Sequence, residues 1–242
     1  MAPLTSPLTV RITRKQYAVL NGTWPLRVFE NFELTVEAGS FLAITGPSGC
    51  GKTTLLNIVA GLDREFEGRI SYGTAAPRLA YVFQTPRLLP WRTVRENVAL
   101  ALPARDPGTS RLETLLDRVG LGRVANEYPD RLSLGMQRRV ALARAFVIEP
   151  DILLMDEPFV SLDEPLAWDL RGLLLDLWSR RRATVLFVTH DRTEAVALAT
   201  RLVLLSSPAA RIIRDTAVSI ADRRRSNLEA ITAEERRLFS DA

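Results

Sequence analysis

A glycine-rich stretch at residues 46–54 holds the residue types that bind phosphate groups. It reads Gly-Pro-Ser-Gly-Cys-Gly-Lys-Thr-Thr, which matches the P-loop pattern. Glycines let backbone N–H groups turn toward phosphate oxygens, and a following helix directs the positive end of its dipole to the same place. We expect Lys52 to reach the β- and γ-phosphates, and the Thr53 hydroxyl to ligate Mg²⁺. The stretch therefore predicts a site for ATP and Mg²⁺, with contacts from Gly46, Pro47, Ser48, Gly49, Cys50, Gly51, Lys52, Thr53 and Thr54.

An acidic pair lies about 100 residues further along the chain. Asp156 and Glu157 directly follow the apolar run at residues 152–155, which is typical of a buried strand. Asp156 would then stand at the sheet edge where the glycine-rich loop lies, and is expected to hold Mg²⁺ through water. Glu157 is placed to act as the general base that polarises the attacking water. Alone, such a pair also fits an ordinary acidic turn after a strand.

Three rare residue types add information. The chain has one histidine, His190, one cysteine, Cys50, and two lysines, Lys15 and Lys52. A lone histidine often has only a structural hydrogen bond, but His190 follows an apolar strand at 184–189 in a nucleotide-binding sheet, so we expect it to contact the γ-phosphate. Cys50 is interpreted as a small loop residue whose alkylation would block nucleotide binding, with a redox or nucleophilic role as the alternative.

The elements that must position these residues alternate along much of the chain. Such alternation favours an α/β fold with a mostly parallel sheet, preceded by an antiparallel β region at the N-terminus. Strand patterns occur at residues 8–13, 28–36, 41–45, 69–72, 79–83, 152–155, 184–189 and 202–206, and helical patterns at 53–60, 166–180 and 193–199.

The middle of the chain has a different pattern. Residues 86–148 contain helical stretches at 94–102, 112–119 and 135–148, which predicts a helical subdomain inserted in the α/β core of a single domain spanning residues 1–242. A helical tail is expected at about 228–242, and the capping-box spacing from Thr232 to Glu235 predicts that its helix starts there.

Composition narrows the class of protein. Of the 242 residues, 47% are hydrophobic and 25% are charged, as in soluble globular domains. No apolar run reaches the roughly 18 residues of a membrane span, and the start lacks an apolar signal core, so we expect a cytoplasmic protein. The single cysteine excludes an internal disulfide framework. Acidic and basic residues are interleaved, and the one dense basic cluster, Arg223 to Arg225, has no aromatic neighbours, which argues against nucleic acid.

Further motifs now identify a family. Gln84 directly follows a predicted strand, Leu132-Ser-Leu-Gly-Met136 precedes a basic helix, and Ser161-Leu-Asp163 comes just after Pro158. In this order, and together with the P-loop and the acidic pair, they resemble the nucleotide-binding subunit of an ATP-binding cassette (ABC) transporter. The resemblance covers nearly the whole chain and implies the P-loop NTPase fold and ATPase activity.

The resemblance implies further roles for single residues. Tyr17 resembles the aromatic residue that stacks on adenine, with Trp24 as the alternative because residues 20–26 blur the alignment. Gln84 would reach Mg²⁺ and the attacking water while sensing a membrane partner. Two copies would sandwich two ATP molecules head to tail: Ser133 and Gly135 would close over the γ-phosphate of the other copy's ATP, and Asp163 would lie at the dimer seam.

One residue departs from the family's pattern. The signature usually reads Leu-Ser-Gly-Gly-Gln, whereas this chain has Leu134 at the first glycine and Met136 at the glutamine. Leu134 removes a glycine where backbone approaches phosphate. Since Ser133 and Gly135 remain, we expect a modified but working site, and Leu134→Gly should alter the ATPase rate or the nucleotide affinity.

The stretch after Gln84 narrows the subfamily. Leu-Leu-Pro-Trp at residues 88–91, with Val-Leu-Leu-Ser-Ser-Pro at 203–208, resembles importers of the nitrate, sulfonate and taurine type. Pro90 and Trp91 would form a rigid apolar rim for a cytoplasmic helix of a permease, unless Trp91 packs inside the helical subdomain. The resemblance implies permease subunits as partners at the cytoplasmic face of the plasma membrane, and an external binding protein that selects the substrate with the permease.

Two other functions compete with transport. A soluble ABC ATPase of DNA repair or translation is the first, although such proteins usually carry two cassettes or long coiled-coil insertions, and this chain has neither. A regulatory module that holds ATP without hydrolysing it is the second, and the presence of both Glu157 and His190 argues against it.

Overall fold

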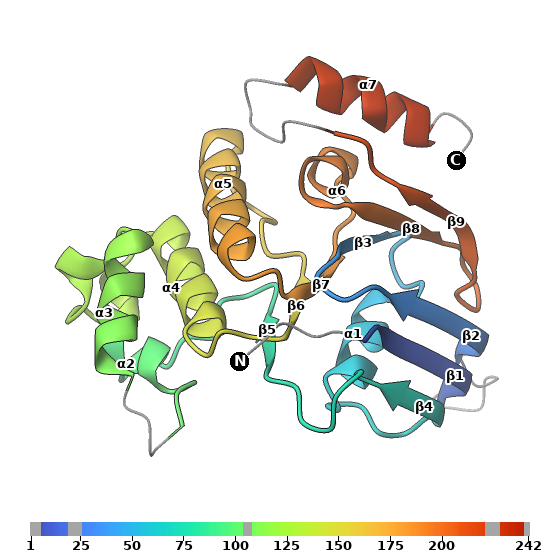
Figure 1. Ribbon diagram of the computed structural model, residues 1–242, viewed down its shortest axis with the longest axis horizontal. Helices are drawn as coiled ribbons and strands as arrows, with labels where there is room; N and C mark the ends of the chain where they lie inside the picture. The colour runs from blue at the N-terminus through green and yellow to red at the C-terminus, as the bar shows by residue number, and fades with distance from the viewer. Residues whose placement is uncertain (1–5, 19–25, 104–107, 221–227, 240–242) are drawn as a thin grey trace. The chain divides into compact units, whose positions relative to one another are not determined.

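The computed structural model describes residues 6–18, 26–103, 108–220 and 228–239 (Figure 1). These residues belong to two compact units. The first unit comprises Met1–Pro77 and Ala183–Ala242, and the second comprises Arg78–Arg182. The second unit is thus inserted in the sequence of the first.

An antiparallel sheet begins the first unit. Strand β1 (Leu8–Tyr17) lies between β2 (Leu26–Val36) and β4 (Glu67–Ser71), and both pairings are antiparallel. Leu8, Val10 and other alternate residues of β1 are buried, as expected for a sheet with one face on the core. The strand is longer than the 8–13 predicted, because its pairing with β2 continues to Tyr17 opposite Leu26.

A second sheet of this unit carries the glycine-rich loop, which follows β3 (Phe41–Thr45). Its strands lie in the order β7 (Thr184–Val188), β3 (Phe41–Thr45), β8 (Arg201–Leu205) and β9 (Ile212–Ala217). The first three are parallel, and β9 pairs antiparallel with β8. All residues of β3 and β7 are buried, as is usual for parallel strands covered on both faces. The sequence analysis missed β9, whose residues are only partly buried or exposed.

Among its described residues, the first unit has three helices: α1 (Lys52–Val59), α6 (Arg192–Leu198) and α7 (Leu228–Phe239), which lies beside α6 in Figure 1. The predicted start of the last helix at Thr232 is wrong. The helix already begins at Leu228, and the Thr232 hydroxyl donates to the Leu228 carbonyl at 2.9 Å, one turn earlier. A capping-box spacing can thus occur inside a helix, where the threonine bonds back to the preceding turn.

In the described part of the second unit, β5 (Leu79–Val82) and β6 (Ile152–Asp156) are parallel strands. Its helices are α2 (Val94–Ala99), α3 (Thr109–Arg118), α4 (Leu134–Phe146) and α5 (Glu164–Arg180), with short 3₁₀ turns η1 (Gly122–Val124) and η2 (Pro129–Arg131). One apolar cluster packs the helices together, and its members include Val94, Val98, Leu112, Leu116, Val140 and Leu177.

An ion pair fixes the starts of the two strands of the second unit. The Arg78 backbone N–H donates to Asp151 Oδ2 at 2.9 Å, and its guanidinium Nη2 donates to Asp151 Oδ1 at 3.0 Å. Burial raises the pKa of the Asp151 carboxyl, but the donors of Arg78 outweigh it and hold that pKa below its ordinary value. Asp151 therefore stays ionised and links β5 to β6. Among the described residues, no helix has both the length and the apolar composition to cross a membrane.

Candidate nucleotide site

The loop at 46–54 has a backbone shape that needs glycine. Gly46 and Gly51 have φ angles of +148° and +108°. A Cβ on Gly46 would lie 2.6 Å from the Leu205 carbonyl oxygen, and one on Gly51 would lie 2.6 Å from Val28 Cγ1. Both the conformation and the lack of space exclude a side chain at these positions.

Lys52 points into the curve of this loop. Its side chain is nearly buried, and its Nζ donates to the carbonyl oxygens of Gly46 at 2.8 Å and Pro47 at 2.9 Å. The ammonium group therefore lies inside the loop, while Thr53 in the first turn of α1 is exposed. A curled glycine loop with an inward cation and a hydroxyl at its helix end fits a triphosphate group.

Cys50 lies within the same loop. It is 3% exposed, and its Sγ is 4.0 Å from Lys52 Nζ. A Cβ on Gly46 would approach this sulfur to 3.1 Å, so the thiol fills the space beside that glycine. The packing is consistent with the interpretation of Cys50 as a small residue of the loop.

Tyr17 lies next to α1, the helix that follows the glycine-rich loop. Its hydroxyl is 3.4 Å from Thr54 Oγ1 in the first turn of α1, and it donates to Asp63 Oδ2 at 3.0 Å. The side chain is 39% exposed. Trp24, the alternative aromatic residue, lies outside the described residues.

His190 comes to the same sheet edge as the loop. It follows β7 and the loop follows β3, and these two strands are parallel neighbours. The chain around His190 is held by Thr189, whose Oγ1 donates to Glu194 at 2.6 Å and accepts from the Asp191 N–H at 3.0 Å. His190 itself is exposed, as a group that meets a ligand must be.

In the second unit, Gln84 and Asp156 share an edge of the β5–β6 pair. Asp156 is the last residue of β6, as predicted, and Gln84 comes two residues after the end of the parallel strand β5. Asp156 is 8% exposed. The next residue, Glu157, has a φ of +43°, a backbone conformation that non-glycine residues rarely adopt and that often occurs at functional sites.

Arg138 is a functional candidate that the sequence analysis missed. It is buried in α4, donates to the carbonyl of Gln84, and donates to the carbonyl of Val160 at 3.1 Å. Burial lowers the pKa of its guanidinium. Arg138 therefore ties α4 both to the Gln84 segment and to the segment that follows Glu157. Its place within a run of polar helix residues gave no signal of burial.

The signature stretch forms the start of α4. Ser133 caps this helix, because its Oγ accepts from the Met136 N–H at 3.3 Å. Leu134 is 41% exposed, whereas Gly135 is buried. A Cβ on Gly135 would lie 2.7 Å from Leu166 Cδ1, which leaves no room for a side chain.

Asp163 caps the next helix. Its carboxylate accepts from the Leu166 N–H of α5 at 3.0 Å. Leu166 thus connects the start of α5 to the start of α4, because its backbone N–H is held by Asp163 and its side chain packs on Gly135. The starts of α4 and α5 form one packed structure, with the exposed Ser133 and Leu134 at its surface.

Each unit therefore gathers part of the predicted site. The first contains Tyr17, the loop from Gly46 to Thr54, and His190; the second contains Gln84, Ser133, Gly135, Asp156, Glu157 and Asp163.

Sequence comparison finds close relatives. A profile of the ABC transporter family matches residues 29–160. The chain is 42% identical over 211 residues to the aliphatic sulfonates import ATP-binding protein SsuB of Bacillus licheniformis, covering 85% of this chain and 82% of that protein. It is 38% identical over 240 residues to the protein of the same name from Bacillus subtilis, covering 97% and 94% of the two chains.

Solved structures with the same fold include two dimeric cassettes. One is a dimeric ATP-binding cassette in a post-hydrolysis state bound to ADP and Pi, with a TM-score of 0.73 and 29% identity over 88% of this chain and 99% of that one. The other is a dimeric bacterial ABC transporter cassette, with a TM-score of 0.75, 30% identity and the same coverage. The predicted P-loop NTPase fold is confirmed.

Proposed function

Since this chain belongs to the ABC transporter family, we propose that it powers an importer of aliphatic sulfonates or chemically related small anions. It is an ATPase, and specifically the ATP-binding subunit of an importer. The observation that carries the substrate class is the identity of 38–42% with relatives named for aliphatic sulfonate import. The competing soluble ABC ATPase is not favoured by these relatives.

The loop at 46–54 binds the triphosphate of ATP in this proposal. Lys52 leaves the carbonyls of Gly46 and Pro47 and moves its two hydrogen bonds to the β- and γ-phosphates. Backbone N–H groups of the loop surround the other phosphate oxygens, and Tyr17 stacks on adenine.

A magnesium ion is expected to arrive with the nucleotide. Among the described residues, no three His, Cys, Asp or Glu side chains are arranged to hold a metal by themselves. The candidate ligands are the Thr53 hydroxyl, the Gln84 amide and the Asp156 carboxylate. These are the oxygen donors that Mg²⁺ prefers, and Mg²⁺ usually takes phosphate oxygens as further ligands. When bound, the ion neutralises charge that develops on the phosphates.

Hydrolysis requires a base beside the phosphate. Glu157 accepts the proton of the attacking water, and Gln84 helps to orient that water. His190 contacts the γ-phosphate from the sheet edge that it shares with the loop. The unusual backbone angle of Glu157 supports a dedicated orientation of its carboxylate.

The second half of the site comes from another copy of the chain. Ser133 and Gly135 close over the γ-phosphate held by the partner's loop, and Asp163 lies at the seam. The N-terminus of α4 suits an anion because the positive end of the helix dipole lies there. The dimeric state of the related cassettes supports the pairing of two copies.

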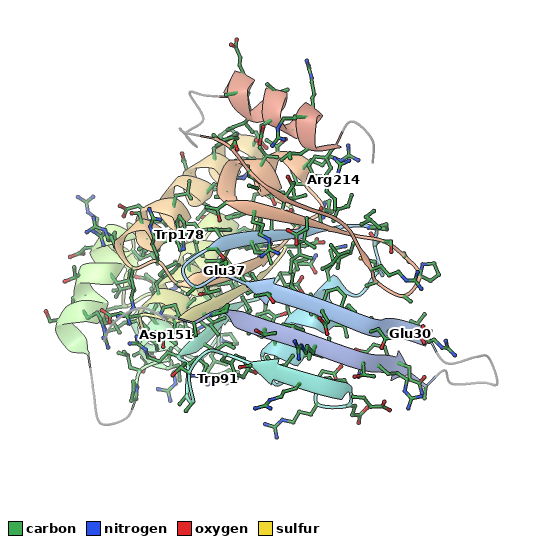
Figure 2. All side chains as sticks on the ribbon, turned by 45° about the vertical axis from the view of Figure 1, so that its right-hand side comes forward. Glu30, Glu37, Trp91, Asp151, Trp178 and Arg214 are labelled. Atoms are coloured by element: carbon green, nitrogen blue, oxygen red, sulfur yellow. The ribbon has the colours of Figure 1, made fainter. Side chains whose placement is uncertain are left out.

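A cavity in the second unit fits the permease. Its volume is about 310 Å³; the apolar lining residues include Leu115, Phe146 and Leu177, and the charged ones are Arg111, Arg118, Glu149, Arg180 and Arg181. This combination suits a short amphipathic helix that carries an acidic residue. The alternative that Trp91 packs in the helical subdomain is wrong, since its side chain is 68% exposed (labelled in Figure 2). Trp91 is a second candidate contact with the permease.

In this proposal the chain works at the cytoplasmic face of the plasma membrane, where the permease holds it. An external binding protein would deliver the solute to that permease. Copurification tests this assignment: protein tagged in its own cells should bring down a polytopic membrane subunit. Leu115→Asp, which places a charge in the apolar part of the cavity, should abolish this capture. A wild-type chain that brings down no membrane protein would contradict the importer function and favour the soluble ATPase.

A further inference from the structure

Lys15 is buried in a chain that otherwise places almost all its positive charge on arginine. Only Lys15 and Lys52 are lysines. The Lys15 side chain is 1% exposed, and its Nζ donates to Asp63 Oδ1 at 2.8 Å and to the Glu65 carbonyl at 2.9 Å. A buried ammonium group needs such partners, because its desolvation is costly.

Asp63 is hydrogen-bonded to the C-terminal part of α1. The Asp63 N–H donates to the Asn57 carbonyl in α1 at 3.1 Å, and its Oδ1 accepts from the Glu65 N–H at 3.1 Å. Burial raises the pKa of the Asp63 carboxyl, but hydrogen bonds from Lys15, the Glu65 backbone and Tyr17 outweigh it, so the pKa lies below its ordinary value. Asp63 is therefore an anion that holds both side chains.

Tyr17 is held by this pair from two directions. Its hydroxyl donates to Asp63 Oδ2 at 3.0 Å, and the Lys15 ammonium lies over its ring, 4.3 Å from the centroid. The same hydroxyl is 3.4 Å from Thr54 Oγ1. The ring is thus tied to both ends of α1, and the cation covers one of its faces, so that a flat ligand would have to stack on the opposite face.

We propose that Lys15 and Asp63 are positioning residues that fix the Tyr17 ring for stacking on the nucleobase of ATP. This inference rests on the proposed stacking role of Tyr17. An ordered ring does not lose rotational freedom when the base binds. The cation also draws π-electron density toward one face, which makes the opposite face a better partner for an electron-rich purine.

A purely structural ion pair would have a different effect. If Lys15 and Asp63 only attached β1 to α1, their loss would weaken the binding of every ligand of the loop along with stability. A positioning role predicts that only the base-dependent part of the affinity falls. Inorganic tripolyphosphate has the phosphates of ATP but no base, so the two roles can be separated.

The experiment measures dissociation constants by calorimetry for ATP and for tripolyphosphate. Lys15→Met and Asp63→Asn should each raise the Kd for ATP about tenfold, in line with the loss of one stacking contact, and should leave the Kd for tripolyphosphate unchanged. The KM for ATP should rise with little change in kcat. The double variant Lys15→Met with Tyr17→Ala should bind ATP no more weakly than Tyr17→Ala alone. Arg14→Met, which removes an exposed cation from the adjacent position, is the matched control and should behave as wild type.

Four results would overturn the proposal, and they have different meanings. If Tyr17→Ala binds both ligands as wild type does, stacking by Tyr17 is wrong and the inference fails with it. If Tyr17→Ala weakens ATP alone but Lys15→Met and Asp63→Asn do not, stacking stands and the positioning role is wrong. If Lys15→Met and Asp63→Asn weaken the binding of ATP and of tripolyphosphate equally, the ion pair has only a structural role. Should they fail to fold, Tyr17→Phe removes only the hydroxyl bond to Asp63 and should raise the Kd for ATP about threefold; an unchanged Kd would reject the proposal.

Discussion

The Lys52 ammonium group donates a 2.8 Å hydrogen bond to the Gly46 carbonyl oxygen, six residues earlier in the same loop. A second bond to Pro47 completes an internal set of partners for the buried cation. The loop therefore holds the Lys52 ammonium group with its own carbonyl oxygens. In the proposed function, binding of ATP would exchange these carbonyl partners for phosphate oxygens, which are stronger acceptors for an ammonium group.

This exchange predicts the effect of removing the cation. Lys52→Met should lower kcat by about 100-fold or more, because a charge directed at the developing phosphate charge is lost. It should also weaken ATP binding. The measurement is a steady-state ATPase assay of the purified protein, with Arg14→Met as a control that removes an exposed cation. A Lys52→Met protein with wild-type kcat would exclude Lys52 from catalysis.

Leu134 offers a test of the signature stretch. Its side chain is 41% exposed at the first turn of α4, between the capping Ser133 and the buried Gly135. Leu134→Gly should change the ATPase rate or the KM for ATP by roughly threefold to tenfold, because it changes the surface that we propose to meet the partner's nucleotide. Leu228, also exposed but in α7, provides the control Leu228→Gly. Equal kinetics for Leu134→Gly and wild type would remove the functional role of this residue.

Two glycines should respond to alanine in opposite ways. Gly135→Ala would bring a Cβ to 2.7 Å from Leu166 Cδ1, and overpacking of this kind should lower the free energy of unfolding by about 1–3 kcal/mol. Gly172, on the exposed side of α5, has open space where a Cβ would lie, with no neighbouring side chain within 4 Å. Gly172→Ala should therefore stabilise the protein by about 0.5–1 kcal/mol. Denaturant unfolding of both variants checks the pair, and a destabilised Gly172→Ala would contradict the packing described.

The Arg78–Asp151 ion pair predicts a pH dependence of stability. The folded-state pKa of Asp151 is below its ordinary value of 3.8, so the folded state binds fewer protons than the unfolded state in this range. The stabilisation is fully present above about pH 5 and is lost as the pH falls through the folded-state pKa. Asp151→Asn should lower the free energy of unfolding by about 1–3 kcal/mol at pH 7.

The difference in the free energy of unfolding between wild type and Asp151→Asn should decrease as the solution is acidified. Unfolding curves recorded from pH 7 to pH 3 would show wild type losing stability more steeply than Asp151→Asn. Glu30→Gln changes an exposed carboxylate on β2 and should follow the wild-type curve (labelled in Figure 2). Parallel curves for wild type and Asp151→Asn would show that the ion pair does not stabilise the fold.

Local spacing was enough to predict much of the candidate site. The glycines and Lys52 lie within a few residues of one another, and the apolar run before Asp156 marks the end of a buried strand. Contacts between distant segments were not predictable in this way. Lys15 and Asp63 are separated by 48 residues, and neither residue type indicates the other as a partner. Arg138 was missed because a buried arginine in a polar run has the same sequence pattern as a solvated one.

Elements with weak apolar patterns were also difficult to predict. Strand β9 is missing from the sequence analysis because an edge strand needs little burial, and its order comes from pairing with β8. The start of α7 was misplaced because Thr232 and Glu235 have the spacing of a cap but lie within the helix. Pairing and helix packing, which a single sequence does not display, decide both cases.

The head-to-tail site is tested most directly by the mass of the Glu157→Gln variant in solution. Loss of the general base should reduce hydrolysis by about 10²–10⁴-fold, so that ATP persists in the closed site. Light scattering should then give 27.0 kDa without nucleotide and twice that mass with saturating ATP, whereas adding Ser133→Arg should restore the monomer. A Glu157→Gln protein that binds ATP but keeps the mass of one chain would contradict the account.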